Sequence, residues 1–199
     1  MAHSLAAGLS RLYGVDVRTY ACDLTNLDKR NQFWQHVKDH GIQFHMLINN
    51  AGVDFEGLFK ERSLQELRTI IRLNIEATLE MTHSVLSHRD PCRTLRIINV
   101  SSLASFYPMP VKAVYAASKR FLLDVSLALN QELRSDDASV TVLCPAGLPT
   151  TLSCITKIEA QGILGQATTL NVGHVASRTV DRALKGRSVY VPGWLNQFM

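Results

Sequence analysis

A tyrosine and a lysine lie four positions apart in a segment with helical character. Tyr115 and Lys119 belong to a stretch, 113–133, that predicts a helix, so their side chains share one face. A free tyrosine titrates near pH ~10, and a neighbouring ammonium group lowers its pKa by stabilising the phenolate. Such a tyrosine can protonate a carbonyl oxygen during reduction and take the proton back during alcohol oxidation. The same pair also occurs on exposed helix faces without a function, so other residues must decide.

Two further polar residues stand where they can support this chemistry. Ser102 follows a predicted strand, 95–100, and its hydroxyl can either hydrogen-bond the carbonyl oxygen that Tyr115 protonates or cap a turn. Asn74 lies among apolar residues of a predicted helix, 63–86. Its amide is either satisfied within the core or bends the helix and holds a water that leads to Lys119. Asn74, Ser102, Tyr115 and Lys119 are therefore the candidate catalytic residues.

Strand-like and helix-like segments alternate along the chain. The sequence predicts strands at 15–21, 45–48, 95–100, 139–143 and 188–191, and helices near 5–9, 26–40, 63–86, 113–133, 155–163 and 172–185. This alternation is typical of an α/β protein with right-handed crossovers and a doubly wound parallel sheet that carries helices on both faces. Ligands of such sheets gather at the carboxyl ends of the strands. Polar clusters follow three of the predicted strands, at 49–52, 101–102 and 145–147.

Local signals fix the ends of two predicted helices. Ser63 and Glu66 have the spacing of a capping box, in which each side chain satisfies a backbone N–H of the first turn. Asn26 or Asp28 is suited to cap the helix before it, and Gly41 is suited to end that helix.

The composition predicts a single globular domain over residues 1–199. The chain has 199 residues, of which 46% are hydrophobic, and a formal net charge of +4. Lysine and arginine are scattered, so we expect no nucleic-acid partner. The four cysteines have no zinc or disulfide-framework spacing, and His36 and His40 have no recognisable third ligand, so we expect reduced thiols and no metal. No stretch is long enough to span a membrane, and we expect a cytoplasmic protein.

Five motifs in order and spacing resemble those of the short-chain dehydrogenase/reductase family. The resemblance covers roughly residues 5–192. The motifs are Asn49-Asn50-Ala51-Gly52, Leu73-Asn74, Asn99-Val100-Ser101-Ser102, Tyr115-Ala116-Ala117-Ser118-Lys119 and Pro145-Ala146-Gly147. The resemblance implies a Rossmann-type sheet, a catalytic tetrad of the four candidate residues, and an oxidoreductase that interconverts carbonyls and alcohols. It also implies NAD or NADP as hydride carrier, without indicating which.

The family's cofactor contacts carry over to positions that match its motifs. The resemblance implies that Asp23 and Leu24 lie at the adenine, and that Asn50, Ala51 and Gly52 form the turn on the ribose side. It implies that Lys119, beside Tyr115, binds the nicotinamide ribose and that Asn74 supports a water relay. The segment beside nicotinamide and pyrophosphate would comprise Pro145, Ala146, Gly147, Leu148 and Thr150, with Ala146 in place of the usual glycine.

The substrate and the oligomeric state depend on other segments. Tyr107, Met109 and Ile155 make the expected substrate segments apolar, which favours a lipophilic ketone or alcohol. Members of the family commonly form homo-oligomers through the helices that hold Asn74 and Tyr115. Four apolar positions suit either such a contact or packing against the sheet, namely Phe121, Leu122, Val125 and Leu129.

The beginning of the chain departs from the family pattern. Family members open with a strand, a glycine-rich turn, a helix and a second strand, and that turn binds the pyrophosphate. Here Gly8 and Gly14 form no such turn. Strand 46–48 is then expected at a sheet edge. Either strand 15–21 docks directly on it, another chain supplies the missing elements, or the sequence is a fragment or a product with a wrongly assigned start, which we favour. The expected N-terminally truncated domain is thus an oxidoreductase or, alternatively, a non-catalytic remnant or dinucleotide-sensing protein.

Overall fold

A computed structural model describes residues 2–149 and 171–193, and every statement below refers to those residues. A π-helical stretch covers Ile71–Ala77. Short 3-10 turns occur at Phe59–Glu61, Leu103–Phe106 and Leu133–Asp136. The main elements in chain order are α1 (Ala2–Tyr13), α2 (Leu27–Asp39), β1 (Met46–Asn49), α3 (Leu64–Ile70), α4 (Thr78–Ser87), β2 (Leu95–Val100), α5 (Ala113–Glu132), β3 (Ala138–Leu143), α8 (Val172–Leu184) and β4 (Val189–Tyr190).

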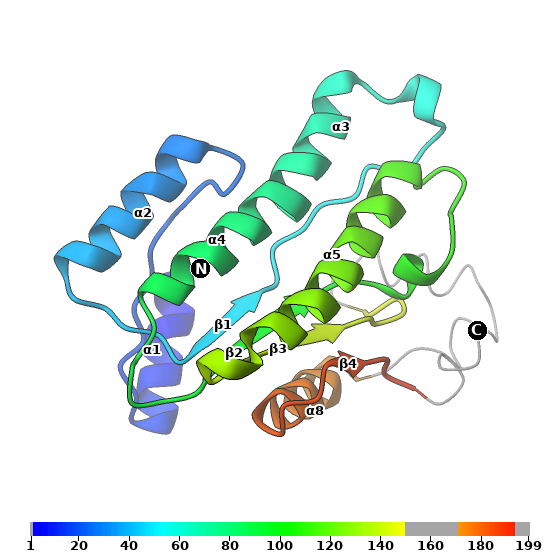
Figure 1. The fold of residues 1–199 in the computed structure, drawn as a ribbon. Coiled ribbons are helices and arrows are strands. Elements are labelled where there is room, and N and C mark those ends of the chain that lie inside the picture. Colours follow the sequence, from blue (N-terminus) through cyan, green and yellow to red (C-terminus); the bar gives the residue numbers. More distant parts are fainter. Residues whose placement is uncertain (1, 150–170, 194–199) are drawn as a thin grey trace.

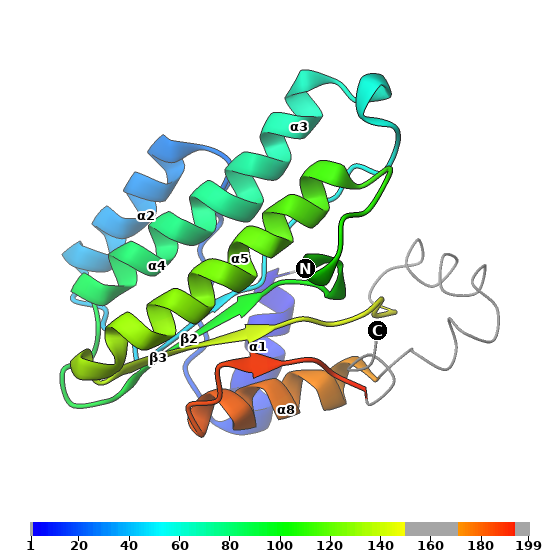
Figure 2. The ribbon, with the colours of Figure 1, turned by 45° about the vertical axis from the view of Figure 1, so that its right-hand side comes forward.

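The four strands form one parallel sheet in the order β1-β2-β3-β4 (Figure 1). Helices α2 to α5 cover one face of this sheet, and α1 and α8 lie on the opposite side (Figure 2). Every residue of β3 is buried, which is the pattern of a strand covered on both faces. The predicted α/β architecture with a parallel sheet between helices is confirmed.

The core lies between β2, β3 and the helices α4 and α5. Ile97 and Val140 are fully buried and pair across the two strands. Leu122 is also buried, and Leu129 packs against this core, so both serve the packing of α5 on the sheet. The buried members of this cluster are Val85, Leu95, Ile97, Leu133, Ala138 and Val140.

The predicted helix starts are present. The Ser63 hydroxyl accepts a hydrogen bond from the backbone N–H of Glu66 at 3.2 Å, and the Glu66 carboxylate accepts from the backbone N–H of Ser63 at 2.8 Å. Asn26 rather than Asp28 caps α2, because its side chain accepts from the backbone N–H of Lys29 at 3.1 Å. These bonds satisfy N–H groups that the first turn of a helix leaves free.

The strand predicted at 15–21 is absent, which corrects the sequence-based expectation. The segment forms no sheet ladder, and Tyr20 packs its ring edge-on against Phe33 of α2 at 5.3 Å between centroids. An alternating pattern produces a strand only where a neighbouring strand supplies hydrogen-bond partners. Within the described residues β1 has β2 as its single neighbour, so the predicted edge position of strand 46–48 is confirmed, and Ile48 remains 51% exposed.

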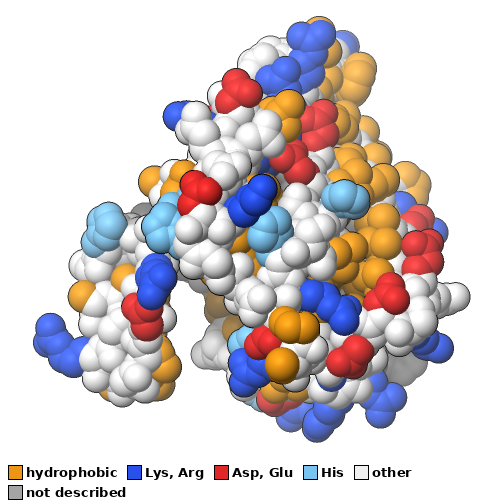
Figure 3. Space-filling view, turned by 60° about the vertical axis from the view of Figure 1, so that its left-hand side comes forward, with side chains coloured by type: hydrophobic (Ala, Val, Ile, Leu, Met, Phe, Trp, Pro, Cys, Tyr) orange, Lys and Arg blue, Asp and Glu red, His pale blue; other side chains and the backbone are white. Residues whose placement is uncertain are grey.

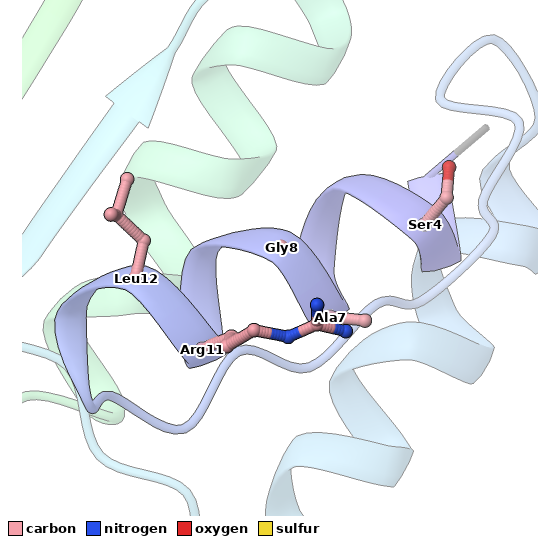
Figure 4. Close-up of a pocket in the computed structure, with 5 residues that line it drawn as sticks. All are labelled: Ser4, Ala7, Gly8, Arg11 and Leu12. Atoms are coloured by element: carbon pink, nitrogen blue, oxygen red, sulfur yellow. The ribbon is translucent and has the colours of Figure 1, made fainter.

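The surface outside the sheet carries mixed charges. On the face shown in Figure 3, lysine and arginine side chains are interspersed with aspartate and glutamate, and apolar groups gather in a band along one side. A hollow beside α1 is lined by Ser4, Ala7, Gly8, Arg11 and Leu12, all from that one helix (Figure 4). No helix in the described parts of the chain has the length and apolar character needed to cross a membrane.

Candidate active site

Lys119 is a buried cation behind the carboxyl end of β2. Its side chain is 5% exposed, and Nζ donates a hydrogen bond to the carbonyl oxygen of Val100 at 2.9 Å. Burial disfavours the ammonium form and lowers the pKa of Lys119 from 10.5 to about 8, although the charges of Cys144 and Asp54 oppose this change. The carbonyl of Val100 occupies one of three donors of the ammonium group.

Tyr115 lies in the first turn of α5, on the same helix face as Lys119. The Lys119 ammonium nitrogen is 5.7 Å from the centroid of the Tyr115 ring. The backbone around the pair is fixed by two hydroxyls, because Ser118 donates to the carbonyl of Tyr115 at 2.7 Å and Ser101 donates to the carbonyl of Lys119 at 2.7 Å. The predicted juxtaposition of Tyr115 and Lys119 on one helix face is present, with the ammonium group near the tyrosine ring.

Asn74 connects this helix to the loop after β1. It lies in the π-helical stretch, is completely buried, and donates from Nδ2 to the carbonyl of Val53 at 3.0 Å and to the Ser118 hydroxyl at 3.1 Å. Its Oδ1 accepts from the backbone N–H of Val53 at 2.9 Å. A π-bulge often marks a functional position, and here it accompanies a side chain whose polar atoms are all engaged. The water relay through Asn74 stays a prediction.

Gly52 approaches the lysine and the asparagine so closely that an added side chain would touch both of them. A Cβ at Gly52 would lie 3.3 Å from Lys119 Nζ and 3.4 Å from Asn74 Oδ1. Asn50 and Ala51 precede it on the exposed turn that follows β1. The structure therefore brings Gly52, Asn74, Tyr115 and Lys119 together, as the motifs predict.

Ser102 and the segment after β3 lie at the same edge of the sheet. Ser102 follows β2, and its hydroxyl accepts from the backbone N–H of Ala104 at 3.2 Å, so it caps the 3-10 turn. The N–H of Leu103 donates to the carbonyl of Pro145 at 2.8 Å and joins the ends of β2 and β3. Of the other predicted positions here, Ala146 and Leu148 are half-buried, Gly147 is exposed, and Thr150 and Ile155 lie outside the described residues.

Asp23 and Leu24 belong to the loop that precedes α2. The Asp23 carboxylate accepts from the backbone N–H and the hydroxyl of Thr25, at 2.9 Å and 2.7 Å, and these bonds lower its pKa. The carbonyl of Leu24 accepts from Arg30, whose guanidinium also pairs with Glu80 of α4 at 2.6 Å. The loop is thus anchored to the helix layer, whereas its role at an adenine is untested.

A hydrogen-bonded pair of amides, one half-buried and one buried, was not predicted from the sequence. Asn49 of β1 donates to Asn99 of β2 at 2.8 Å and to Thr82 of α4 at 3.0 Å. Asn99 in turn donates to the Ser126 hydroxyl of α5 at 2.9 Å. An asparagine at the end of each of two apolar strands is the signal that could have revealed this network.

An apolar cavity lies next to α5 and is lined in part by Ala116 and Ala117, which follow Tyr115 on that helix. Tyr107 and Met109, which the sequence assigns to a substrate segment, line it together with Phe106 and Arg120. None of the four candidate catalytic residues lines this cavity.

The described residues contain no cluster of three or more side chains that could hold a metal. The ring centroids of His36 and His40, at the end of α2, are 4.1 Å apart, and the ring planes are tilted by 39°. Among the described cysteines, Cys22, Cys92 and Cys144 are unpaired thiols, of which Cys144 is buried, Cys22 is half-buried and Cys92 is exposed.

The buried lysine makes stability depend on pH. Because the pKa of Lys119 is lower in the folded chain, at about 8, than its ordinary 10.5, the unfolded chain binds more protons between these values. We expect the free energy of unfolding to rise with pH across this window, by up to about 3 kcal/mol relative to a Lys119→Met variant. Denaturant unfolding of both proteins at several pH values measures this, and parallel pH curves would contradict it.

Comparison with known proteins assigns the family. Residues 1–157 match the family described as short chain dehydrogenase. A very-long-chain 3-oxoacyl-CoA reductase from Laccaria bicolor is 32% identical over 159 residues, covering 79% of this chain and 47% of that protein. A 17-beta-hydroxysteroid dehydrogenase type 3 from Mus musculus is 31% identical over 155 residues, covering 75% of this chain and 49% of that protein. This chain belongs to the short-chain dehydrogenase family, and it spans about half the length of these two relatives.

A solved structure agrees with this assignment. The short-chain dehydrogenase from Sphingobium yanoikuyae in complex with NADPH superposes with a TM-score of 0.81 at 24% identity, covering 97% of this chain and 74% of that one. The likeness shows a common fold. The two relatives above that match are named as a reductase and a dehydrogenase.

Proposed function

We propose that the protein catalyses the NAD(P)-dependent interconversion of a carbonyl and an alcohol, with Tyr115 as the proton donor for reduction and acceptor for oxidation. The observation that carries this proposal is the buried Lys119, with its lowered pKa, 5.7 Å from the Tyr115 ring. A cation beside a tyrosine favours the phenolate form of its side chain, and such a tyrosine can give up and take back a proton.

The residues around Lys119 fit the nicotinamide-ribose end of the cofactor. An ammonium group has three donors, and among the described residues Lys119 uses one of them on the carbonyl of Val100, so ribose hydroxyls would be suitable acceptors for the others. The missing side chain at Gly52 leaves the turn after β1 open beside this ammonium group. Within 2–149 and 171–193, no glycine-rich turn joins a strand to a helix, so the fit supports this end of the cofactor and leaves NAD or NADP open.

The remaining residues of the site have distinct roles in the proposed reaction. The chemistry that a bound nicotinamide supplies is the hydride, delivered to the carbonyl carbon. Ser102, at the end of β2, would orient the carbonyl oxygen, and Tyr115 would protonate it. Lys119 would stabilise the resulting phenolate, and Asn74 would hold the loop after β1 against α5.

The substrate we propose is a lipophilic ketone or alcohol. The two curated relatives are named for an oxoacyl thioester and a hydroxysteroid, in which the reacting carbon belongs to a large apolar body. Tyr107 and Met109, near the site on the chain, are apolar as such a substrate requires. We also propose that residues 1–199 act as one domain.

Dinucleotide binding and turnover test the proposal. NADH and NADPH would each be titrated by nicotinamide fluorescence, and oxidation of each would be followed with a 3-oxoacyl thioester and a keto steroid as substrates. We expect binding of one dinucleotide and turnover of at least one carbonyl compound. Binding without turnover of either substrate would instead favour a dinucleotide-sensing protein, and the absence of both would favour a non-catalytic chain.

A further inference from the structure

A second ammonium group lies beside Tyr115. The Nζ of Lys112 is 5.7 Å from the centroid of the Tyr115 ring, the same distance as that of Lys119. Lys112 is paired with two carboxylates of the loop after β1, Asp54 at 2.6 Å and Glu56 at 3.3 Å. Tyr115 therefore has two ammonium groups at the same distance from its ring, and that of Lys112 is itself paired with two carboxylates.

The ion cluster is held in place from both sides. On the side of β1, Val53 is bonded to Asn74 and directly precedes Asp54. On the side of α5, Lys112 occupies the position before the first turn, and the carbonyl of Val111 accepts from the N–H of Gly57 at 2.8 Å. Val111 has a φ of 60°, which is unfavourable for a β-branched residue and shows that the surrounding contacts determine this backbone.

The charges of this cluster are only partly exposed to solvent. The side chains of Lys112 and Asp54 are 22% and 23% exposed, so their interactions are screened less than those of surface pairs. Burial alone would lower the pKa of Lys112, but the bonds to Asp54 and Glu56 outweigh it and raise the pKa, which keeps Lys112 charged. The charge of Asp54 also acts on Lys119, so the field of the cluster extends to the proposed catalytic pair.

We propose that Lys112 is a positioning residue that acts through Tyr115 as a second cation, and that Asp54 and Glu56 attenuate its effect. The proposal rests on the acid–base role of Tyr115 proposed above. Among the described residues, the charged and titratable groups near the tyrosine include Lys119 from its own helix and Lys112 before that helix. They also include Asp54 and Glu56 from the loop after β1, and Cys144, which follows β3 and acts on Lys119.

Opposite charges in the cluster must shift proton binding in opposite directions. Removing the ammonium group of Lys112 leaves two carboxylates uncompensated, so the Tyr115–Lys119 pair holds its proton more tightly and its apparent pKa rises. Removing the charge of Asp54 leaves more of the positive charge of Lys112 uncompensated. The apparent pKa of the Tyr115–Lys119 pair therefore falls. A merely structural role would weaken activity in both variants without this opposition.

Lys112→Met and Asp54→Asn test the proposal. In the pH profile of kcat/KM, we expect the limb due to the Tyr115–Lys119 pair to move up by about one pH unit in Lys112→Met and down by a similar amount in Asp54→Asn. Lys112→Arg keeps the charge and should keep the wild-type profile. The matched changes Lys38→Met and Asp39→Asn, on exposed positions of α2, should move neither limb.

A second measurement requires no turnover. The ultraviolet titration of tyrosinate in each variant, minus that of the same variant carrying Tyr115→Phe, isolates the ionisation of Tyr115 and should show the same opposite shifts. Shifts in one direction, or none, in variants that retain the wild-type circular dichroism would overturn the proposal. The wild type could turn over no carbonyl compound while the tyrosine titrations of the variants shift as expected. That outcome would contradict the proposed reaction and support the role of Lys112.

Discussion

Replacing Tyr115 by phenylalanine is expected to lower kcat/KM for carbonyl reduction by about a thousandfold. The substitution removes the hydroxyl that would carry the proton and leaves a ring of nearly the same shape. The backbone of Tyr115 stays anchored, because its carbonyl accepts from the Ser118 hydroxyl and this bond does not involve the phenol. Steady-state kinetics with the dinucleotide and the carbonyl compound that the wild type accepts would measure the loss.

The control for this variant is a tyrosine on α1. Tyr13 is 66% exposed, so Tyr13→Phe removes the same atom without touching the site and should retain wild-type turnover. The dissociation constant of the dinucleotide should change little in Tyr115→Phe, because Lys119 remains to bind the ribose. If Tyr115→Phe turned over at the wild-type rate, the proposed role of this residue would be wrong.

Replacing Asn74 by leucine is expected to lower the free energy of unfolding by about 4 kcal/mol. The leucine is similar in size but leaves the N–H and the carbonyl of Val53 without their partners, and it deprives the Ser118 hydroxyl of a donor. Each orphaned buried group costs free energy, and Asn74 itself has no exposed surface. Urea unfolding at equilibrium would give the difference.

Asn31 provides the comparison for this substitution. It is exposed on α2, and Asn31→Leu should change the free energy of unfolding by less than about 0.5 kcal/mol. We also expect kcat to fall in Asn74→Leu, because the loop that carries Gly52 would lose its link to α5. A stability of Asn74→Leu equal to that of Asn31→Leu would show that the amide contributes nothing to this connection.

Local patterns in the sequence predicted most of the elements that form the site. The capping box at Ser63 and Glu66 and the spacing of Tyr115 and Lys119 depend on neighbours within one helix, and both are present as expected. The prediction of a strand at 15–21 was wrong, because an alternating pattern does not indicate whether a partner strand is present. Secondary structure that requires a distant partner is the weak point of such reasoning.

The parts of the site that the sequence did not reveal depend on where separate segments meet. The pair of Lys112 with Asp54 joins two loops, and nothing near either residue indicates the other. The function of Asn74 as a link to Val53 and Ser118 was also unpredicted, although its position within the tetrad was expected. Such contacts follow from loop conformation and helix packing, which a single sequence does not display.

The bond between Asn49 and Asn99 ties the active site to the alignment of the sheet. These residues are paired directly across β1 and β2, and Asn99 passes the connection to Ser126 of the helix that carries Tyr115. A slip of one residue between the strands would turn the two amides to opposite faces and separate them. The register of β1 against β2 and the position of the helix that carries Tyr115 are therefore coupled. A chain that folds with the wrong register would lose the catalytic arrangement as well as the packing of the sheet.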